Sequence, residues 1–256
     1  MKNVEKIGNY LRETVNFIIK IIVGEKCNDK FSQWKKCKRV RMFGPQILKK
    51  FKLIADRNNL KYSPIYGTLL GIYREHGFIK HDDDIDIAFD YETMSYNFLT
   101  ELKGAGFEMI QFFVSDTKDC IHFAFKIHKV KFDLYSYNIE KNHVTLSAPI
   151  CEKYAIEIFE KTNRFLIERA EFDFKGYSKD NALCDSLSIF SNSKEILEII
   201  YGPNFMTPIK DAHSGTISDN YRIVPIEESY YKFYQKKDAD KLLTNEQYYN
   251  EFIKNK

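Results

Sequence analysis

Residues 66–90, YGTLLGIYREHGFIKHDDDIDIAFD, place a turn, an apolar helix pattern and a cluster of aspartates in one short stretch. The aspartates lead into IDIAF, which has the apolar character of a short buried strand. Because side chains alternate between the two faces of a strand, Asp84 and Asp86 project together and the isoleucines beside them point into the core. Carboxylates held this close repel each other, and a cation between them relieves the repulsion. Hard oxygen ligands favour Mg²⁺, with Mn²⁺ as the second choice; the alternative is a solvated acidic loop.

The residues before the aspartates predict a strand followed by a helix. Residues 60–66 have a strand pattern, and Gly67 and Thr68 then open a helix with an apolar period. Gly67 allows the backbone to approach a ligand closely, and Thr68 can cap the helix. The free amides at such a helix start suit a phosphate group, so we expect a phosphate site there. An ordinary strand-to-helix turn, which often contains the same residue types, is the alternative.

A resemblance to a known family rests on these motifs. Residues 67–87, GTLLGIYREHGFIKHDDDIDI, resemble the signature of the LicD/fukutin-related family in the nucleotidyltransferase superfamily. The usual form of the signature is GTLLG, then an Arg, then Ile-Pro-Trp-Asp-Asp-Asp-Ile-Asp. The positions that match it are Gly67, Thr68, Leu69, Leu70, Gly71, Arg74, Ile79, Asp82, Asp83, Asp84, Ile85 and Asp86.

The chain departs from the family signature at two adjacent positions, and a second motif further along the chain supports the resemblance. Lys80 and His81 stand where the family usually has Pro-Trp, which leaves the carboxylates in place and concerns the wall of the expected donor site. Residues 201–208, YGPNFMTP, resemble a second family element of the form YG...MTP. The likeness therefore covers the middle of the chain and not its first part.

The third acid of the expected metal site is Asp133, in the sequence KFDLY at residues 131–135. Its neighbours Phe132 and Leu134 are apolar, so Asp133 faces the opposite side of a strand. Asp is disfavoured in strands and is costly to bury without a partner. In the superfamily the third metal-binding acid comes from a strand beside the Asp-x-Asp strand, and FDLY resembles the family's version. A solvent-facing position on a surface strand is the alternative.

The resemblance implies an α+β fold, with a nucleotidyltransferase-like mixed β-sheet flanked by helices and a helical C-terminal part. We expect an N-terminal amphipathic helix and basic segment (1–42), a catalytic core (43–148) and a mainly helical C-terminal part that completes the site (149–256). The residue patterns predict helices at 45–58, 91–104, 151–168 and 195–201, and strands at 107–114, 120–128 and 130–137. The last two strands are nearly contiguous, so we expect a tight hairpin with Lys129 near its turn.

The resemblance also implies a reaction. Family members are similar to phosphotransferases that move phosphocholine, glycerol phosphate or ribitol phosphate from a CDP-activated donor to a sugar hydroxyl of a cell-surface glycan, such as lipopolysaccharide, capsule or teichoic acid. Asp84, Asp86 and Asp133 would be the catalytic metal ligands. The expected substrate-binding residues are Gly67, Thr68, Arg74, Asp82, Tyr201 and Gly202. The acceptor would be a glycan or a lipid-linked glycan.

Two other functions would use the same features. A nucleotidyltransferase that attaches a nucleoside monophosphate to a sugar, an antibiotic or a protein needs the same carboxylates, but it releases pyrophosphate instead of CMP. A binding module with a decayed active site is the third candidate. The complete set of three acids argues against decay.

The composition excludes other partner classes. The chain has 256 residues, 44% of them hydrophobic, and its net charge of +3 is too small to indicate a nucleic-acid partner. Its five cysteines are spread singly along the chain. This spacing favours a reducing, cytoplasmic location over a disulfide framework or a zinc site.

The N-terminal region leaves two interpretations open. Residues 4–23 predict an amphipathic helix whose apolar run is too short to span a membrane, and a basic segment at 35–41 follows Trp34. An apolar helix beside a basic segment fits an anionic membrane surface, which would place the protein at the inner face of the membrane. We favour the alternative, a helix packed on the core and a solvated basic turn, because charge runs are usually solvated.

Overall fold

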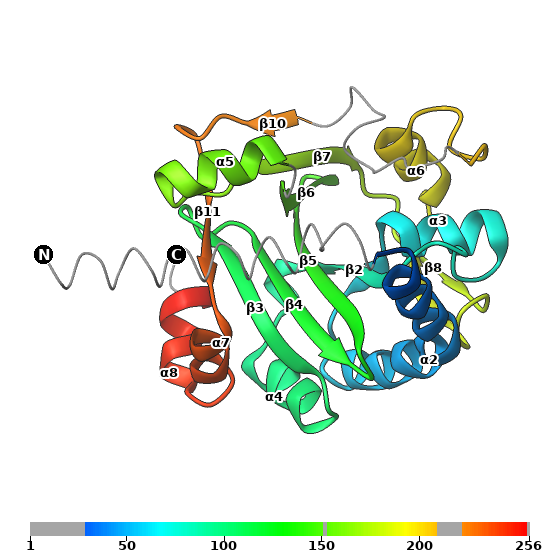
Figure 1. Cartoon of the computed structure of the whole chain (residues 1–256), viewed down its shortest axis with the longest axis horizontal. Coiled ribbons are helices and arrows are strands. Elements are labelled where there is room, and N and C mark those ends of the chain that lie inside the picture. Colours follow the sequence, from blue (N-terminus) through cyan, green and yellow to red (C-terminus); the bar gives the residue numbers. More distant parts are fainter. Residues whose placement is uncertain (1–28, 151–152, 209–221, 255–256) are drawn as a thin grey trace, which may run out of the picture.

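The computed structural model describes residues 29–150, 153–208 and 222–254, so the helix expected at residues 4–23 lies outside the described residues. The described helices are α2 (Asp29–Arg57), α3 (Tyr66–Glu75), η1 (Tyr91–Thr93), α4 (Tyr96–Gly104), α5 (Lys153–Thr162), α6 (Ser193–Tyr201), α7 (Lys236–Leu242), α8 (Glu246–Tyr249) and η3 (Asn250–Lys254). The described strands are β1 (Tyr62–Pro64), β2 (Asp84–Asp90), β3 (Glu108–Ser115), β4 (Ile121–Ile127), β5 (Val130–Glu140), β6 (His143–Pro149), β7 (Ile167–Asp173), β8 (Tyr177–Asp180), β9 (Leu187–Phe190), β10 (Arg222–Val224) and β11 (Tyr231–Tyr234). This mixture confirms the predicted α+β class (Figure 1).

Nine of the described strands form one mixed sheet. Seven lie in the order β10-β7-β6-β5-β4-β3-β11, while β2 pairs with β5 and β1 pairs with β2. Strand β5 is shared, because β4 pairs antiparallel along one edge and β2 pairs parallel along the other. From Tyr137 onward, β5 pairs with β6. The two strands that carry the predicted acids are therefore direct neighbours in the centre of the sheet.

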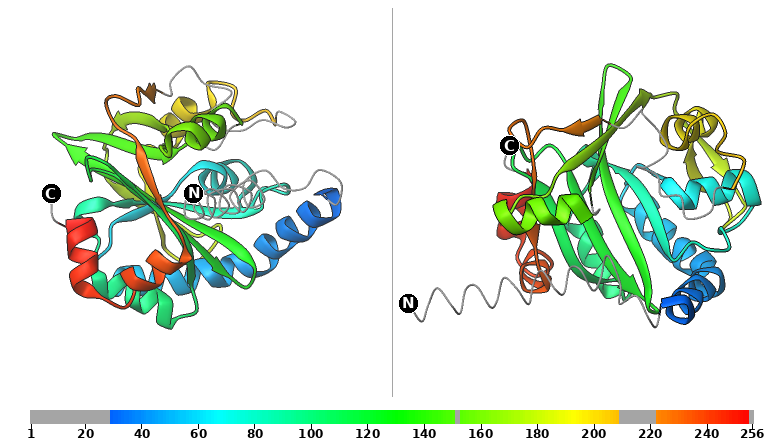
Figure 2. Two further views of the ribbon diagram at one scale, coloured as in Figure 1. Left: turned by 60° about the vertical axis from the view of Figure 1, so that its left-hand side comes forward. Right: turned by 45° about the horizontal axis from the view of Figure 1, so that its top comes forward.

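The main hydrophobic core fixes which face of these strands is polar. Ile85 and Ile87 of β2 and Phe132 and Leu134 of β5 are fully buried in one cluster with Phe51 of α2. Helices α2 and α4 cover this face of the sheet (Figure 2). Because side chains alternate along a strand, the aspartates of β2 and β5 must then project from the opposite face.

Helix α2 starts earlier than the helix predicted at residues 45–58. It begins at Asp29, so Pro45 lies inside the helix rather than in its first turn, and the basic segment at 35–41 is helical. Cys37 and Val40 are buried at helical spacing before Pro45, which continues the apolar face upstream. That packing outweighs the backbone hydrogen bond that proline removes. Helix α2 also runs through the boundary that we placed between residues 42 and 43.

The segment after the aspartates follows the prediction with one break. The helix expected at 91–104 divides into η1 and α4, and Ser95 between them caps α4 by accepting the Phe98 amide at 3.1 Å. The predicted β4–β5 hairpin is confirmed, with Ile127 paired to Val130. Its two turn residues, His128 and Lys129, have φ of 51° and 63°, as in a type I′ turn.

The C-terminal part contains more strands than we predicted, and this expectation needs correction. Strands β7, β10 and β11 join the main sheet, and β8 and β9 form a separate two-stranded sheet. The region predicted as one helix at 151–168 ends its helix at Thr162, and β7 begins at Ile167. In β7, IERAEFD, buried Ile167, Ala170 and Phe172 accompany more exposed acidic residues, a strand-like pattern that the helix assignment overlooked.

Two further observations concern the cysteines and the length of the apolar helices. Cys37, Cys120 and Cys184 are free thiols in the described part of the chain. None of the described helices has an apolar stretch long enough to cross a bilayer.

Candidate active site

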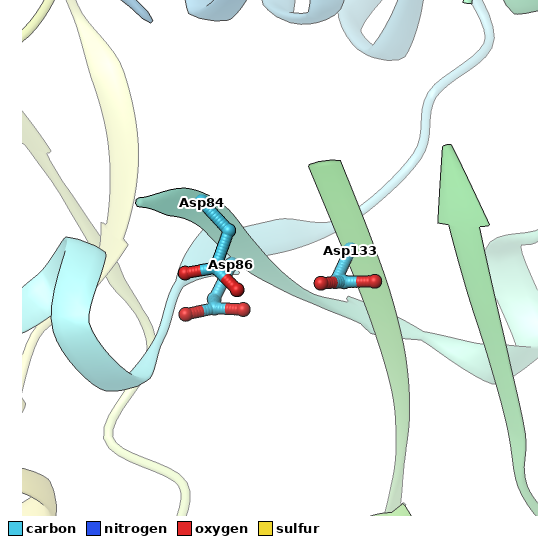
Figure 3. Close-up of side chains that lie close together, drawn as sticks. All are labelled: Asp84, Asp86 and Asp133. Atoms are coloured by element: carbon cyan, nitrogen blue, oxygen red, sulfur yellow. The ribbon is translucent and has the colours of Figure 1, made fainter. Parts of the chain in front are cut away.

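Three carboxylates meet where β2 and β5 run side by side. Asp86 lies opposite Asp133 in the parallel register, and Asp84 precedes Asp86 by two residues on the same face. One oxygen from each of the three carboxylates lies within 4.8 Å of the other two. Figure 3 shows the three side chains on the same side of the two strands. The structure thus brings together the three acids that the sequence suggested as metal ligands.

The cluster carries more negative charge than the single ammonium of Lys131 offsets. Burial raises the pKa of Asp84 to about 6; Lys131 opposes this rise, and Asp83 and Asp133 add to it. Burial also raises the pKa of Asp86 well above its usual value, and the charges of Asp84 and Asp133 act in the same direction. Like charges held together in this way are what a bound cation would relieve.

Asp133 is held by two nitrogen groups. Lys131 Nζ lies 2.7 Å from Oδ2 of Asp133, and His122 Nε2 lies 3.0 Å from Oδ1. Burial alone would raise the pKa of Asp133, but Lys131 and His122 outweigh it and hold the pKa below its usual value. The carboxylate is therefore ionised and accepts a hydrogen bond from the imidazole N–H.

His122 reaches Asp133 from the neighbouring strand β4. Its ring stacks on Tyr135 at 4.4 Å between centroids with 2° between the ring planes, and on Phe113 at 5.3 Å. Burial lowers the pKa of His122, even though Asp133 opposes this shift. The imidazole is thus a neutral, rigidly packed donor that fixes the orientation of one metal-ligand candidate.

Gly67 and Thr68 lie at the start of α3, beside the carboxylates. A Cβ atom on Gly67 would come within 2.6 Å of Asp82 Oδ2, so only glycine fits without moving that carboxylate. Thr68 is fully buried, and its hydroxyl accepts the backbone amide of Asp86 at 2.9 Å. The threonine therefore joins α3 to β2 and sets the position of Asp86, whereas its expected contact with a phosphate stays a prediction.

The remaining acidic and basic residues of the motif have different partners. Burial and the charges of Asp84 and Asp83 raise the pKa of Asp82 well above its usual value. Asp83 faces away from the cluster toward α2, where Lys36 Nζ lies 3.4 Å from it. Arg74 pairs with its neighbour Glu75 at 2.9 Å, and its side chain is only 12% exposed. The ion-pair partner of Arg74 is therefore Glu75 and not a carboxylate of the cluster.

Tyr201 and Gly202 end helix α6, which packs against α3. Gly202 has a positive φ of 81° and an extended ψ of 172°, a combination that is essentially restricted to glycine. The turn that follows packs Phe205 against Tyr73 of α3, with 5.6 Å between ring centroids. The element therefore supports α3, and its expected contact with substrate stays a prediction.

The residues present fit a divalent cation. All three candidate ligands offer hard carboxylate oxygens, which suit Mg²⁺ and Mn²⁺. Asp133 Oδ2 is buried and, although Lys131 lies beside it, accepts no well-oriented hydrogen bond in the described part of the chain. An ionised oxygen of this kind, aimed into an acidic cluster, is available as a metal ligand.

The sequence interpretation missed Lys131 and His122. The strand register gives both residues their cross-strand neighbours: Lys131 lies opposite Asp84, and His122 lies opposite Tyr135. Lys131 precedes Asp133 by two residues, so its place on the same face was readable from strand alternation alone. His122 had no such local signal, because pairing between β4 and β5 decides its neighbours.

Fold and site together define a nucleotidyltransferase-like domain with an acidic triad on its central strands. The family model described as "LicD/FKTN/FKRP, nucleotidyltransferase domain" matches residues 59–178. The match supports assignment of this region to the LicD/FKTN/FKRP family, and the region includes the three carboxylates but ends before Tyr201.

One curated relative is also similar to part of this chain. It is the uncharacterized protein RP689 of Rickettsia prowazekii (strain Madrid E), which is 39% identical over 61 residues. The match covers 22% of this chain and 23% of the relative, so it supports a local likeness only.

Proposed function

We propose that this chain is a metal-dependent phosphotransferase that moves a phospho-alcohol from a CDP-activated donor to a sugar hydroxyl of a cell-surface glycan. Phosphocholine, glycerol phosphate and ribitol phosphate are the candidate groups. The observation that carries the proposal is the carboxylate triad within 4.8 Å, in a domain of this family. Held by Asp84, Asp86 and Asp133, Mg²⁺ or Mn²⁺ would supply charge neutralisation at the donor diphosphate.

The residues around α3 would position the donor. The amide of Gly67 at the helix start suits a phosphate oxygen, and Arg74 adds a cation on the same helix. Asp82, packed against Gly67, would shape the wall of that site. Tyr201 and Gly202 belong to the element that packs on α3, which supports a role for them at the mouth of the donor site.

Asp133 has a second conceivable role, as acceptor of the proton from the attacking hydroxyl. Its low pKa argues for a ligand role instead, because a carboxylate stabilised by Lys131 and His122 is a weaker base. We therefore assign Asp133 to metal binding first. The acceptor in this proposal is a glycan or a lipid-linked glycan, and a peripheral membrane contact of the N-terminal region would bring the enzyme to a lipid-linked one.

Product analysis tests the proposal. The purified chain, supplied with Mg²⁺, a glycan acceptor and CDP-choline, CDP-glycerol or CDP-ribitol in turn, should release CMP with one of the donors. Release of pyrophosphate from a nucleoside triphosphate, without CMP release from any CDP-alcohol, would instead identify a nucleotidyltransferase. Addition of a chelator should stop the reaction.

A matched pair of variants links the activity to the triad. Asp84→Asn should reduce turnover by at least about a thousandfold, since it removes a charged metal ligand. Asp83→Asn is the control, because Asp83 faces Lys36 rather than the cluster, and it should keep most of the activity. Equal activity of both variants would contradict the assignment of the metal site.

A further inference from the structure

Lys131 occupies the place of a cation inside the carboxylate cluster. It lies on β5 two residues before Asp133 and opposite Asp84 in the parallel register. Its Nζ is 2.7 Å from Asp133 Oδ2 and 3.6 Å from Asp84 Oδ2, so the ammonium contacts two of the three expected metal ligands. The strand register, not sequence separation alone, produces this bridging position.

The ammonium and a divalent cation compete for the same oxygen. A divalent ion of the magnesium type binds carboxylate oxygens at roughly 2.0–2.1 Å, which is inside the distance that Lys131 now keeps to Asp133 Oδ2. Two cations at one oxygen repel each other strongly in a partly buried site. Binding of a divalent ion to Asp84 and Asp133 would therefore weaken the hold of these carboxylates on the ammonium and favour its departure.

Lys131 has a route out of the cluster. Its side chain is 39% exposed, whereas that of Asp133 is 0% exposed. The flexible lysine side chain can swing toward solvent while its backbone stays in β5. Because it is anchored next to Asp84, the displaced ammonium stays close to the metal site, where the phosphate groups of a nucleotide donor would bring new negative charge.

We propose that Lys131 exchanges partners during the catalytic cycle: it is the counter-ion of Asp84 and Asp133 without metal, and a ligand of the donor phosphate once a divalent cation has taken its place. The counter-ion role follows from the metal site alone. The phosphate role rests on the proposed function. The exchange keeps the charge of the cluster partly compensated before metal binding and supplies one positive charge to the donor after it.

Metal binding without nucleotide tests the first role. Isothermal titration of the full chain with Mn²⁺ should show tighter binding by Lys131→Gln than by the unaltered chain, by about tenfold or more, because a competing cation has been removed. Lys126→Gln is the matched control: Lys126 is exposed and lies directly opposite Lys131 on β4. Its affinity for Mn²⁺ should change far less. Equal or weaker binding of Mn²⁺ by Lys131→Gln would overturn the counter-ion role.

Nucleotide binding in saturating Mn²⁺ tests the second role. Lys131→Gln should bind the CDP-alcohol at least about tenfold more weakly than the unaltered chain, and Lys131→Arg should recover much of the loss, since it keeps the charge. Unchanged nucleotide affinity in Lys131→Gln would overturn the phosphate role. If the unaltered chain binds no CDP-alcohol at all, the proposed function fails with the phosphate role, while the Mn²⁺ titration still decides the counter-ion role.

Discussion

At the level of single residues, the buried carboxylates that would bind a ligand also reduce the stability of the fold. Asp86 and Asp133 are buried, and the raised pKa of Asp86 means that its ionised form destabilises the fold at neutral pH. Lys131 offsets this only in part. Buried carboxylates with strongly shifted pKa values are found most often where they bind a ligand. The triad therefore indicates function more than any other feature of this chain.

Gly67 is the residue at which a small change should disturb the site without touching a carboxylate. In Gly67→Ala the new Cβ would lie 2.6 Å from Asp82 Oδ2, so the Asp82 carboxylate must move. We expect a loss of about 1–3 kcal/mol in the free energy of unfolding and weaker metal binding. Chemical denaturation and Mn²⁺ titration measure the two effects.

Gly104→Ala is the control for that substitution. A Cβ atom at Gly104 meets no other atom within 4 Å, and the residue ends helix α4. The variant should be as stable as the unaltered chain or more stable by up to about 1 kcal/mol. If Gly67→Ala behaves like Gly104→Ala, the close packing of Gly67 against Asp82 has no influence on the site.

At the level of elements, the β4–β5 turn brings Asp133 and His122 into register while holding unfavourable backbone angles. Lys129 has φ of 63°, a conformation that costs a residue with a side chain about 1–2 kcal/mol. Lys129→Gly should therefore raise the free energy of unfolding by about 0.5–1 kcal/mol after the entropy cost of glycine. Thermal unfolding measures this, and Lys126→Gly in the adjacent strand should have the opposite effect.

The elements near the motif could be predicted from sequence because their signals are local. Alternation in residues 84–90 and 130–137 predicts the two strands that carry the aspartates. Gly67 marks the start of a helix, and the short gap between β4 and β5 predicts the hairpin. The length of helix α2 was underestimated because a proline usually lies in the first turn of a helix. Only the packing of residues before Pro45 on the core shows that the helix begins earlier. The face of Lys131 was readable from alternation, but its contact with Asp84 depends on pairing between β5 and β2, which are distant in sequence. His122 was missed because the exact register of the β4–β5 hairpin decides its neighbours.

At the level of the whole molecule, the sheet joins regions that the sequence analysis separated. Strand β7 pairs with β6 and strand β11 pairs with β3, so residues after 149 complete both sides of the central sheet. Tyr249 and Ile253 are buried in the same core as α4. We infer that the catalytic region depends on the C-terminal part for its stability.

A fragment of residues 43–148 should therefore fail to fold on its own. Removal of β7 and β11 would expose two long strand edges and the apolar surface beneath α7 and α8. We expect circular dichroism to show no cooperative thermal transition for this fragment, in contrast to the full chain. A sharp transition for the fragment would show that this region is an independent domain.

The most direct test of the account is the thermal stability of the full chain and of Asp86→Asn, each with and without Mg²⁺. The unaltered chain should gain stability when Mg²⁺ is added, by about 2.7 kcal/mol at a concentration 100 times the dissociation constant. Asp86→Asn should be more stable than the unaltered chain without metal, because one buried charge is gone, and should not respond to Mg²⁺. An equal response of both proteins to Mg²⁺, or no response from the unaltered chain to Mg²⁺ or Mn²⁺, would contradict the metal site on which the proposed transferase reaction depends.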